Sequence, residues 1–151
     1  MLAPQPLLPF LATLQFGVFL NNVEHFDSEA FGIMRSEAVT MDPQQRLLLH
    51  AVHAALTGGT HSVSGRNVGA YVGIAATDYD PLSRQFGVPI SSFSFTAASP
   101  SVASGRISYV FGLRGQNASV DAACSASLVA THLACLAFRD GPMEGALACG
   151  V

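Results

Sequence analysis

The alternation of apolar and polar positions predicts helices and buried strands in turn along most of the chain. The clearest helix is expected to begin at Asp42, because aspartate caps helix starts and Pro43 suits the first helical position. Its end is expected at Gly58 and Gly59. Five apolar residues within it recur at helical spacing and predict one buried face: Leu48, Leu49, Val52, Ala55 and Leu56.

Three short apolar runs predict buried strands over residues 68–74, 118–122 and 146–151. A helix is expected directly after the second run, from Cys124 to about Arg139, with a Gly-Pro stop beyond it. Since buried strands alternate with helices, the pattern predicts an α/β fold built in layers.

The pattern is less regular between the first two strands. A polar segment is expected over residues 78–94, and a helix is expected to end at Gly105, before the apolar stretch 106–111. Ahead of the first long helix, Ser36 and Glu37 predict a helical turn that ends near residue 40.

The chain has few charges for its size. Half of its 151 residues are hydrophobic and 11% are charged, against about 25% charged in an average soluble domain. Because so few charges do not cover an ordinary monomer surface, we expect burial by a partner or by a missing part of the fold. The net charge of −3, without a basic face, argues against nucleic acid as a partner.

Residues 1–20 carry no charged side chain and invite comparison with a targeting segment. Pro4, Pro6 and Pro9 argue against a membrane-spanning helix, and the basic region and cleavage site of a signal peptide are absent. We expect residues 1–18 to form an irregular segment, with a targeting role as the alternative. The protein is accordingly expected in the cytoplasm, without a membrane partner.

Cys124 is the candidate for chemistry, because it stands where a strand passes into a helix with almost no linker. A thiol at such a junction faces unpaired N–H groups and the helix dipole, which favour the thiolate. The alternative is a buried cysteine that acts as a small hydrophobe. The flanking residues are small and leave room for a substrate: Ala122, Ala123, Ser125, Ala126 and Ser127.

The other two cysteines are expected to be structural. Cys135 lies in an apolar helical stretch and is expected in the core, whereas Cys149 is expected as a small residue in a tight strand. Three cysteines without metal-ligand spacing indicate neither a disulfide framework nor a zinc site. A reducing compartment fits this pattern.

Three strings stand out from the rest of the chain: Met41-Asp-Pro-Gln-Gln-Arg-Leu-Leu-Leu49, Ser104-Gly-Arg-Ile-Ser-Tyr109 with Phe111-Gly-Leu113, and Val120-Asp-Ala-Ala-Cys-Ser125. They resemble successive signatures of β-ketoacyl synthase (ketosynthase) domains, in the form found in type I polyketide synthases. The matches follow the family's order and spacing over about residues 19–151.

This resemblance implies a partial thiolase-like fold, the N-terminal βαβαβ half of a layered α/β/α/β/α architecture. Residues 19–151 then form the N-terminal half of a ketosynthase, an incomplete domain. The partners implied are an acyl carrier protein, the missing C-terminal half of the domain and, once completed, a second copy in a homodimer.

The same resemblance aligns Cys124 with the family's acyl-accepting nucleophile. In the family this cysteine takes an acyl group from a phosphopantetheine thiol on the carrier protein, as a low-pKa thiol does readily. It then gives the group to a carbanion made by decarboxylating a malonyl-type extender. The cysteine's own N–H forms part of the oxyanion hole. No directly bound cofactor or metal is expected, because phosphopantetheine arrives as the carrier's thioester.

The histidines depart from the family pattern. The family uses two histidines in motifs beyond those matched here, and the five in this chain occupy neither position. His50 and His53 stand where the family has glutamate and an aromatic residue, and a structural role is expected for both. His132 lies eight residues beyond Cys124, about 12 Å along a helix axis, which is too far for its base.

Two alternatives follow from these departures. A cysteine hydrolase built from Cys124, His132 and Asp121 fails on this spacing, because Asp121 belongs to the strand and His132 lies far down the helix. A catalytically silent ketosynthase-like fragment, with at most a role in association, stays open beside a working part of a synthase.

Smaller departures leave the nucleophile in place. Serine replaces alanine at Ser104, Gln116-Asn117 replaces a proline-containing turn, and Ala126 replaces a common serine. Cys149 stands in place of a glycine, so its side chain is expected where backbones usually pack closely.

Overall fold

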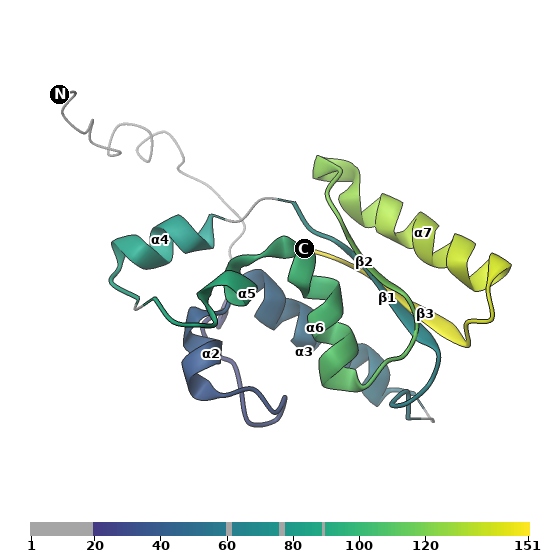
Figure 1. Cartoon of the computed structure of the whole chain (residues 1–151), viewed down its shortest axis with the longest axis horizontal. Helices are drawn as coiled ribbons and strands as arrows, with labels where there is room; N and C mark the ends of the chain where they lie inside the picture. Colours follow the sequence, from purple (N-terminus) through teal and green to yellow (C-terminus); the bar gives the residue numbers. More distant parts are fainter. Residues whose placement is uncertain (1–19, 60–61, 76–77, 89) are drawn as a thin grey trace.

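A three-stranded parallel sheet forms the centre of the protein, in the order β2-β1-β3, with helices on both faces (Figure 1). The structure, a computed structural model, describes residues 20–59, 62–75, 78–88 and 90–151, so the expected irregular segment 1–18 lies outside its described part. The strands are β1 (Val68–Gly73), β2 (Asn117–Val120) and β3 (Gly145–Gly150). This confirms the predicted α/β layers and, within one or two residues, the three predicted strands.

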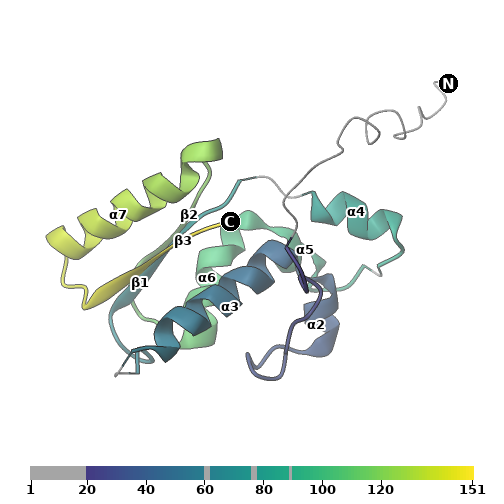
Figure 2. The ribbon, with the colours of Figure 1, turned by 180° about the vertical axis from the view of Figure 1, so that it is seen from behind.

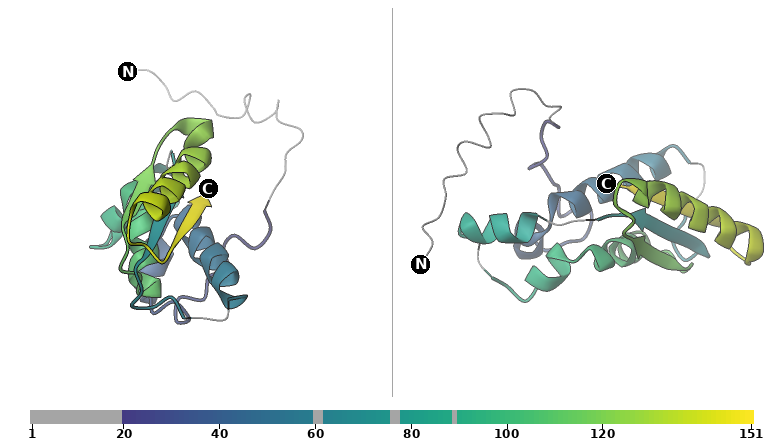
Figure 3. Two further views of the ribbon diagram at one scale, coloured as in Figure 1. Left: turned by 90° about the vertical axis from the view of Figure 1, so that its right-hand side faces the viewer. Right: turned by 90° about the horizontal axis from the view of Figure 1, so that it is seen from above.

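The helices divide between the two faces and one end of the sheet. One face is covered by α3 (Pro43–Thr57) and α6 (Ala103–Phe111), with α2 (Arg35–Thr40) beside them, and the other by α7 (Ala126–Asp140) (Figure 2). Two shorter helices, α4 (Tyr79–Gln85) and α5 (Ser94–Ala98), lie beyond the carboxyl ends of the strands (Figure 3). Single 3₁₀ turns, η1 (Pro100–Val102) and η2 (Ala123–Ser125), precede α6 and α7.

The start of α3 forms as predicted. The Asp42 carboxylate accepts a hydrogen bond from the Gln44 N–H at 2.8 Å, and Pro43 is the first helical residue. Burial of the Asp42 carboxyl raises its pKa, against the lowering effect of the bonds from Gln44. Leu48, Leu49 and Val52 are buried and Leu56 is partly buried against the same core, but Ala55 is exposed. The prediction was therefore wrong for Ala55.

The segment after α5 differs from the sequence prediction. A helix was expected to end at Gly105, but α6 begins at Ala103 and runs through Gly105 to Phe111. Burial of Ile107, which is 1% exposed, outweighs the cost of about 1 kcal/mol for glycine inside a helix. The helix instead ends at Gly112, whose φ of 66° is the left-handed conformation that favours glycine.

The central strand β1 presents different side chains to the two faces. Val68, Ala70 and Val72 point into the core formed with α3 and α6. Tyr71 packs against α7, flanked on the same face by Gly69 and Gly73. One face is thus filled by apolar side chains, and the other leaves room for a helix to approach the backbone.

Candidate active site at the carboxyl edge of the sheet

Cys124 lies at the carboxyl edge of the parallel sheet, in the 3₁₀ turn η2 that joins β2 to α7. Its side chain is exposed, which excludes the alternative of a buried structural cysteine. The connection is only five residues long between the end of β2 at Val120 and the start of α7 at Ala126. The predicted junction of strand, cysteine and helix is therefore confirmed as a structural feature.

The turn before Cys124 contains a strained residue. Ala123 has a φ of 48°, which costs a residue with a Cβ about 1–2 kcal/mol. The Asp121 carboxylate accepts a hydrogen bond from the Ala123 N–H at 3.1 Å. On the other side, the Ser125 hydroxyl donates to the Ala122 carbonyl at 2.7 Å. These two bonds hold the bend that places the thiol at the tip of the turn.

Two glycines allow the strands to meet the first turn of α7. A Cβ on Gly73, the last residue of β1, would lie 2.4 Å from the Ser127 nitrogen, far inside contact distance. A Cβ on Gly150, the last residue of β3, would lie 2.0 Å from the Ser127 Oγ. The ends of β1 and β3 therefore support the start of the helix that follows Cys124.

The other cysteines differ in part from expectation. The prediction that Cys135 lies in the core was wrong, because α7 packs on the sheet through Ala126, Ala130 and Ala134 and turns Cys135 outward. Cys149 lies in β3 as expected, and burial raises the pKa of its thiol. Its side chain packs against the α3 and α6 core. The close packing of backbones that was predicted at Cys149 occurs instead at Gly150, which lies against Ser127 of α7.

Three of the described histidines contact neighbouring side chains, and His132 lies far along α7 from Cys124. His50 and His53 pack their rings on Phe31, with centroid distances of 5.5 and 5.8 Å, which confirms the predicted structural role. His25 lies in an exposed loop with its Nε2 3.7 Å from a Glu24 oxygen. His132 is exposed on α7, about 12 Å beyond the thiol along the helix axis. His61 was expected in a loop and lies outside the described residues.

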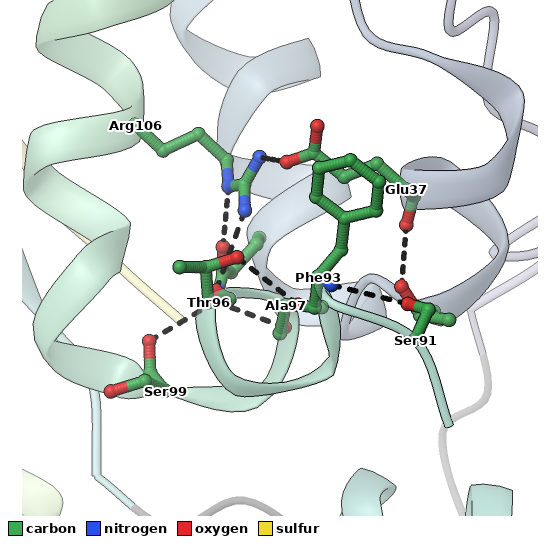
Figure 4. Close-up of polar contacts among 9 residues, drawn as sticks. Glu37, Ser91, Phe93, Thr96, Ala97, Ser99 and Arg106 are labelled. Atoms are coloured by element: carbon green, nitrogen blue, oxygen red, sulfur yellow. Dashed lines mark hydrogen bonds and ion pairs between the residues drawn. The ribbon is translucent and has the colours of Figure 1, made fainter.

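A buried polar network holds the segment that flanks this edge of the sheet. The Arg106 guanidinium on α6 is 8% exposed, forms an ion pair with Glu37 and donates to the Gln45 Oε1 at 2.7 Å. Figure 4 shows it directed at Glu37 and at the Thr96 carbonyl on α5. A buried charge needs both a counter-ion and hydrogen bonds, and Arg106 has both, so we assign this network a structural role.

Gln45 completes the network from α3. Its amide nitrogen donates to the carbonyls of Ala97 and Ser99, each at 3.1 Å. The two family strings that contain Gln45 and Arg106 are therefore joined across 61 positions. Local sequence patterns carry no signal for this contact. Its effect is to fix α5 and η1 at the end of the sheet where Cys124 lies.

Neither a metal centre nor a membrane span accompanies this site within the described residues. No group of three or more histidine, cysteine or acidic side chains there could hold a metal ion. Among the helices within the described ranges, none has the length and apolar character needed to cross a membrane.

Comparison with known proteins relates this chain to one family. The sequence profile of the family "Beta-ketoacyl synthase, N-terminal domain" matches residues 4–151. The chain is 43% identical over 150 residues to the spectinabilin polyketide synthase system protein NorC of Streptomyces orinoci, covering 97% of this chain and 7% of that protein. It is 42% identical over 151 residues to the polyketide synthase GfsA of Streptomyces halstedii, covering 98% of this chain and 2% of that protein.

Solved structures agree with the sequence matches. The ketosynthase from module 6 of the bacillaene synthase of Bacillus subtilis 168 superposes with a TM-score of 0.74 at 32% identity, covering 87% of this chain and 22% of that one. The oxazolomycin ketosynthase domain OzmH KS7 of Streptomyces albus JA3453 gives a TM-score of 0.76 at 33% identity, covering 88% and 24%. The chain thus spans about a quarter or less of the length of each of these four proteins.

Proposed function

Since this chain belongs to the β-ketoacyl synthase N-terminal domain family, we propose that Cys124 is the acyl-accepting nucleophile of a polyketide ketosynthase. The observation that carries the proposal is the exposed thiol on the strained turn between β2 and α7. The N–H groups at the start of a helix favour negative charge, both on a thiolate and on the oxygen of a tetrahedral intermediate. The Cys124 N–H is our candidate for one donor to that oxygen.

The proposed reaction has two steps. The Cys124 thiolate attacks the thioester carbonyl of an acyl group on the phosphopantetheine arm of an acyl carrier protein, and the pantetheine thiolate leaves and takes up a proton. A malonyl-type thioester then loses carbon dioxide, and the resulting carbanion attacks the acyl carbonyl on Cys124. The β-ketoacyl product stays on the carrier, and the Cys124 thiolate is released. The malonyl carboxylate supplies the electron pair, so no redox partner is needed.

For the 151 residues present here we propose the first step without the second. Ketosynthases assist decarboxylation with histidines, and the described histidines of this chain face Phe31, Glu24 or solvent instead. When catalytic residues act as a unit, their effects on the rate are not additive, and the absence of some of them removes most of the rate enhancement of the whole unit. The rest of a ketosynthase domain, the carrier protein and a second copy in a homodimer are the partners that this function requires.

The test measures both steps on the full chain. Incubation with a short-chain acyl-phosphopantetheine thioester is expected to add one acyl mass, which peptide mapping assigns to Cys124. The adduct is expected to disappear in Cys124→Ala and to persist in Cys135→Ala, which removes an exposed thiol from the helix that follows. With radiolabelled malonyl carrier protein, carbon dioxide release is expected to equal that of the Cys124→Ala control. Equal labelling of Cys124 and Cys135 would exclude a special role for Cys124.

A further inference from the structure

The strand that leads to Cys124 contacts α6 through polar side chains. Ser119 on β2 donates its hydroxyl to the Ser104 Oγ at 3.1 Å, and the Ser104 Oγ donates to the Asn117 Oδ1 at 3.3 Å. The Ser104 N–H also donates to the Ser119 Oγ, at 3.2 Å. Ser104 is 1% exposed, so a lost partner here leaves a buried polar group unsatisfied.

The other two strands meet the same helix layer differently. On that face β1 presents Val68, Ala70 and Val72, and β3 presents Leu147 and Cys149. Apolar contact is not directional and permits small sliding, whereas hydrogen bonds fix atoms at a set distance and angle. The position of β2 is therefore set by its backbone pairing with β1 and, against α6, by its hydroxyl and amide bonds.

A shift of β2 would also displace the turn that carries the Cys124 thiol. Ser119 pairs with Val72 of β1 and precedes Asp121 by two residues. Asp121 in turn holds the N–H of the strained residue directly before Cys124. Displacement of the strand would move this carboxylate and let the turn relax.

We propose that Ser104, Asn117 and Ser119 form a positioning network that fixes Cys124 at the start of α7. Ser104 and Asn117 are two of the positions at which the chain departs from the family pattern, and the structure brings the two into contact. The inference rests on the proposed role of Cys124, but it concerns the reactivity of the thiol and not the transfer of an acyl group.

The test compares Ser119→Val with Ser119→Thr in the full chain. Both replacements are β-branched and suit a strand, and they differ only in a methyl group or a hydroxyl. The readout is the rate of alkylation by iodoacetamide at each of the three cysteines, measured by peptide mass spectrometry. Cys135 is an exposed reference in the same molecule, and the partly buried Cys149 reports loss of fold.

In Ser119→Val the ratio of Cys124 to Cys135 alkylation is expected to fall by about threefold or more, the factor expected for one hydrogen bond. The ratio falls because the turn that carries the thiol is no longer held in place by β2. Ser119→Thr is expected to stay within about twofold of the parent. Ser104→Ala is expected to give a smaller fall, because its N–H still reaches Ser119.

Ser108→Ala is the control, since its buried hydroxyl donates to the backbone carbonyl of Ser104 within α6 and not to the Ser104 hydroxyl that faces β2. It is expected to leave the ratio unchanged. The proposal is overturned if the valine and threonine variants give equal ratios, or if the ratio falls only in step with exposure of Cys149. Because alkylation needs no thioester substrate, these outcomes are independent of whether Cys124 accepts an acyl group.

Discussion

The two faces of the sheet are built on different principles. On the α3 and α6 face, large side chains such as Leu49 and Ile107 are fully buried, and a charged network ties the helices together. On the opposite face, α7 approaches the sheet through small residues and leaves Leu128 74% exposed and Phe138 54% exposed. The first face is filled by large side chains, whereas α7 buries only the side of the helix that lies on the sheet.

Part of the apolar surface that the low charge of the sequence predicts lies on the α7 face. An apolar groove of about 430 Å³ runs between α7 and β3, lined by residues that include Cys135, Phe138 and Ala146. Soluble proteins seldom leave apolar patches uncovered. The expectation of a partner or of further fold therefore applies to the α7 face, and also to exposed aromatic residues of other helices such as Phe95 and Tyr109.

The largest expected effect is a loss of stability on the α3 and α6 face. Leu49→Ala is expected to lower the free energy of unfolding by about 2–5 kcal/mol, because it opens a cavity among fully buried neighbours. Leu128→Ala removes the same atoms from the open face and is expected to change the stability by less than about 0.5 kcal/mol. Urea unfolding followed by circular dichroism measures both, and equal losses would contradict the comparison.

A smaller effect is expected where α7 meets the sheet. Gly73→Ala places a Cβ 2.4 Å from the Ala126 and Ser127 backbone, so the helix must shift, at an expected cost of about 1–3 kcal/mol. The same unfolding measurement applies. Gly58→Ala is the control, because an added Cβ there meets nothing within 4 Å at the end of α3. A Gly73→Ala chain as stable as the parent would show that α7 does not depend on this contact.

The smallest effect concerns pH and the start of α3. Burial raises the pKa of Asp42 above 3.8, so the native state binds this proton more tightly than the unfolded chain. The stability that Asp42 contributes is therefore fully present below 3.8 and is lost as pH rises through the higher folded-state value. Asp42→Asn is the matched variant, because asparagine also caps helices but its side chain has no carboxyl group to titrate.

The measurement is the free energy of unfolding of both proteins between about pH 3 and pH 7. The variant is expected to gain stability relative to the parent as pH rises through this window, and then to keep a constant difference. The acids whose pKa is lowered by arginine, Asp140 and Glu144, titrate alike in both proteins and cancel in the difference. A difference that does not change with pH would contradict the role assigned to burial.

Local sequence patterns predict the elements well and their surroundings less well. Asp42 and Pro43 specify the start of α3 by local chemistry, and the apolar run of β1 specifies a buried strand whatever its neighbours are. The family strings also indicate Cys124 as the candidate nucleophile, a role that stays a prediction. These signals are all contained within a few consecutive residues.

The errors have a different origin. Cys135 was expected in the core because α7 is largely apolar, and only the packing of its alanines shows which side faces the sheet. Gly105 was expected to end a helix, although burial of the neighbouring Ile107 carries the helix through it. The contact between Gln45 and Arg106, and that between Ser104 and Asn117, join segments that no local pattern relates.

The strand order also sets the course of folding. Residues of β1 pair with residues 47 positions later in β2, as Ala70 does with Asn117, and 77 positions later in β3, as Val68 does with Gly145. Parallel pairings over such distances form slowly, because the loop entropy is lost before the strands gain their bonds. During synthesis β1 therefore emerges long before either neighbour, as an apolar strand with two open edges. For that interval its unpaired edges can pair with other chains, which is a hazard that chaperones prevent.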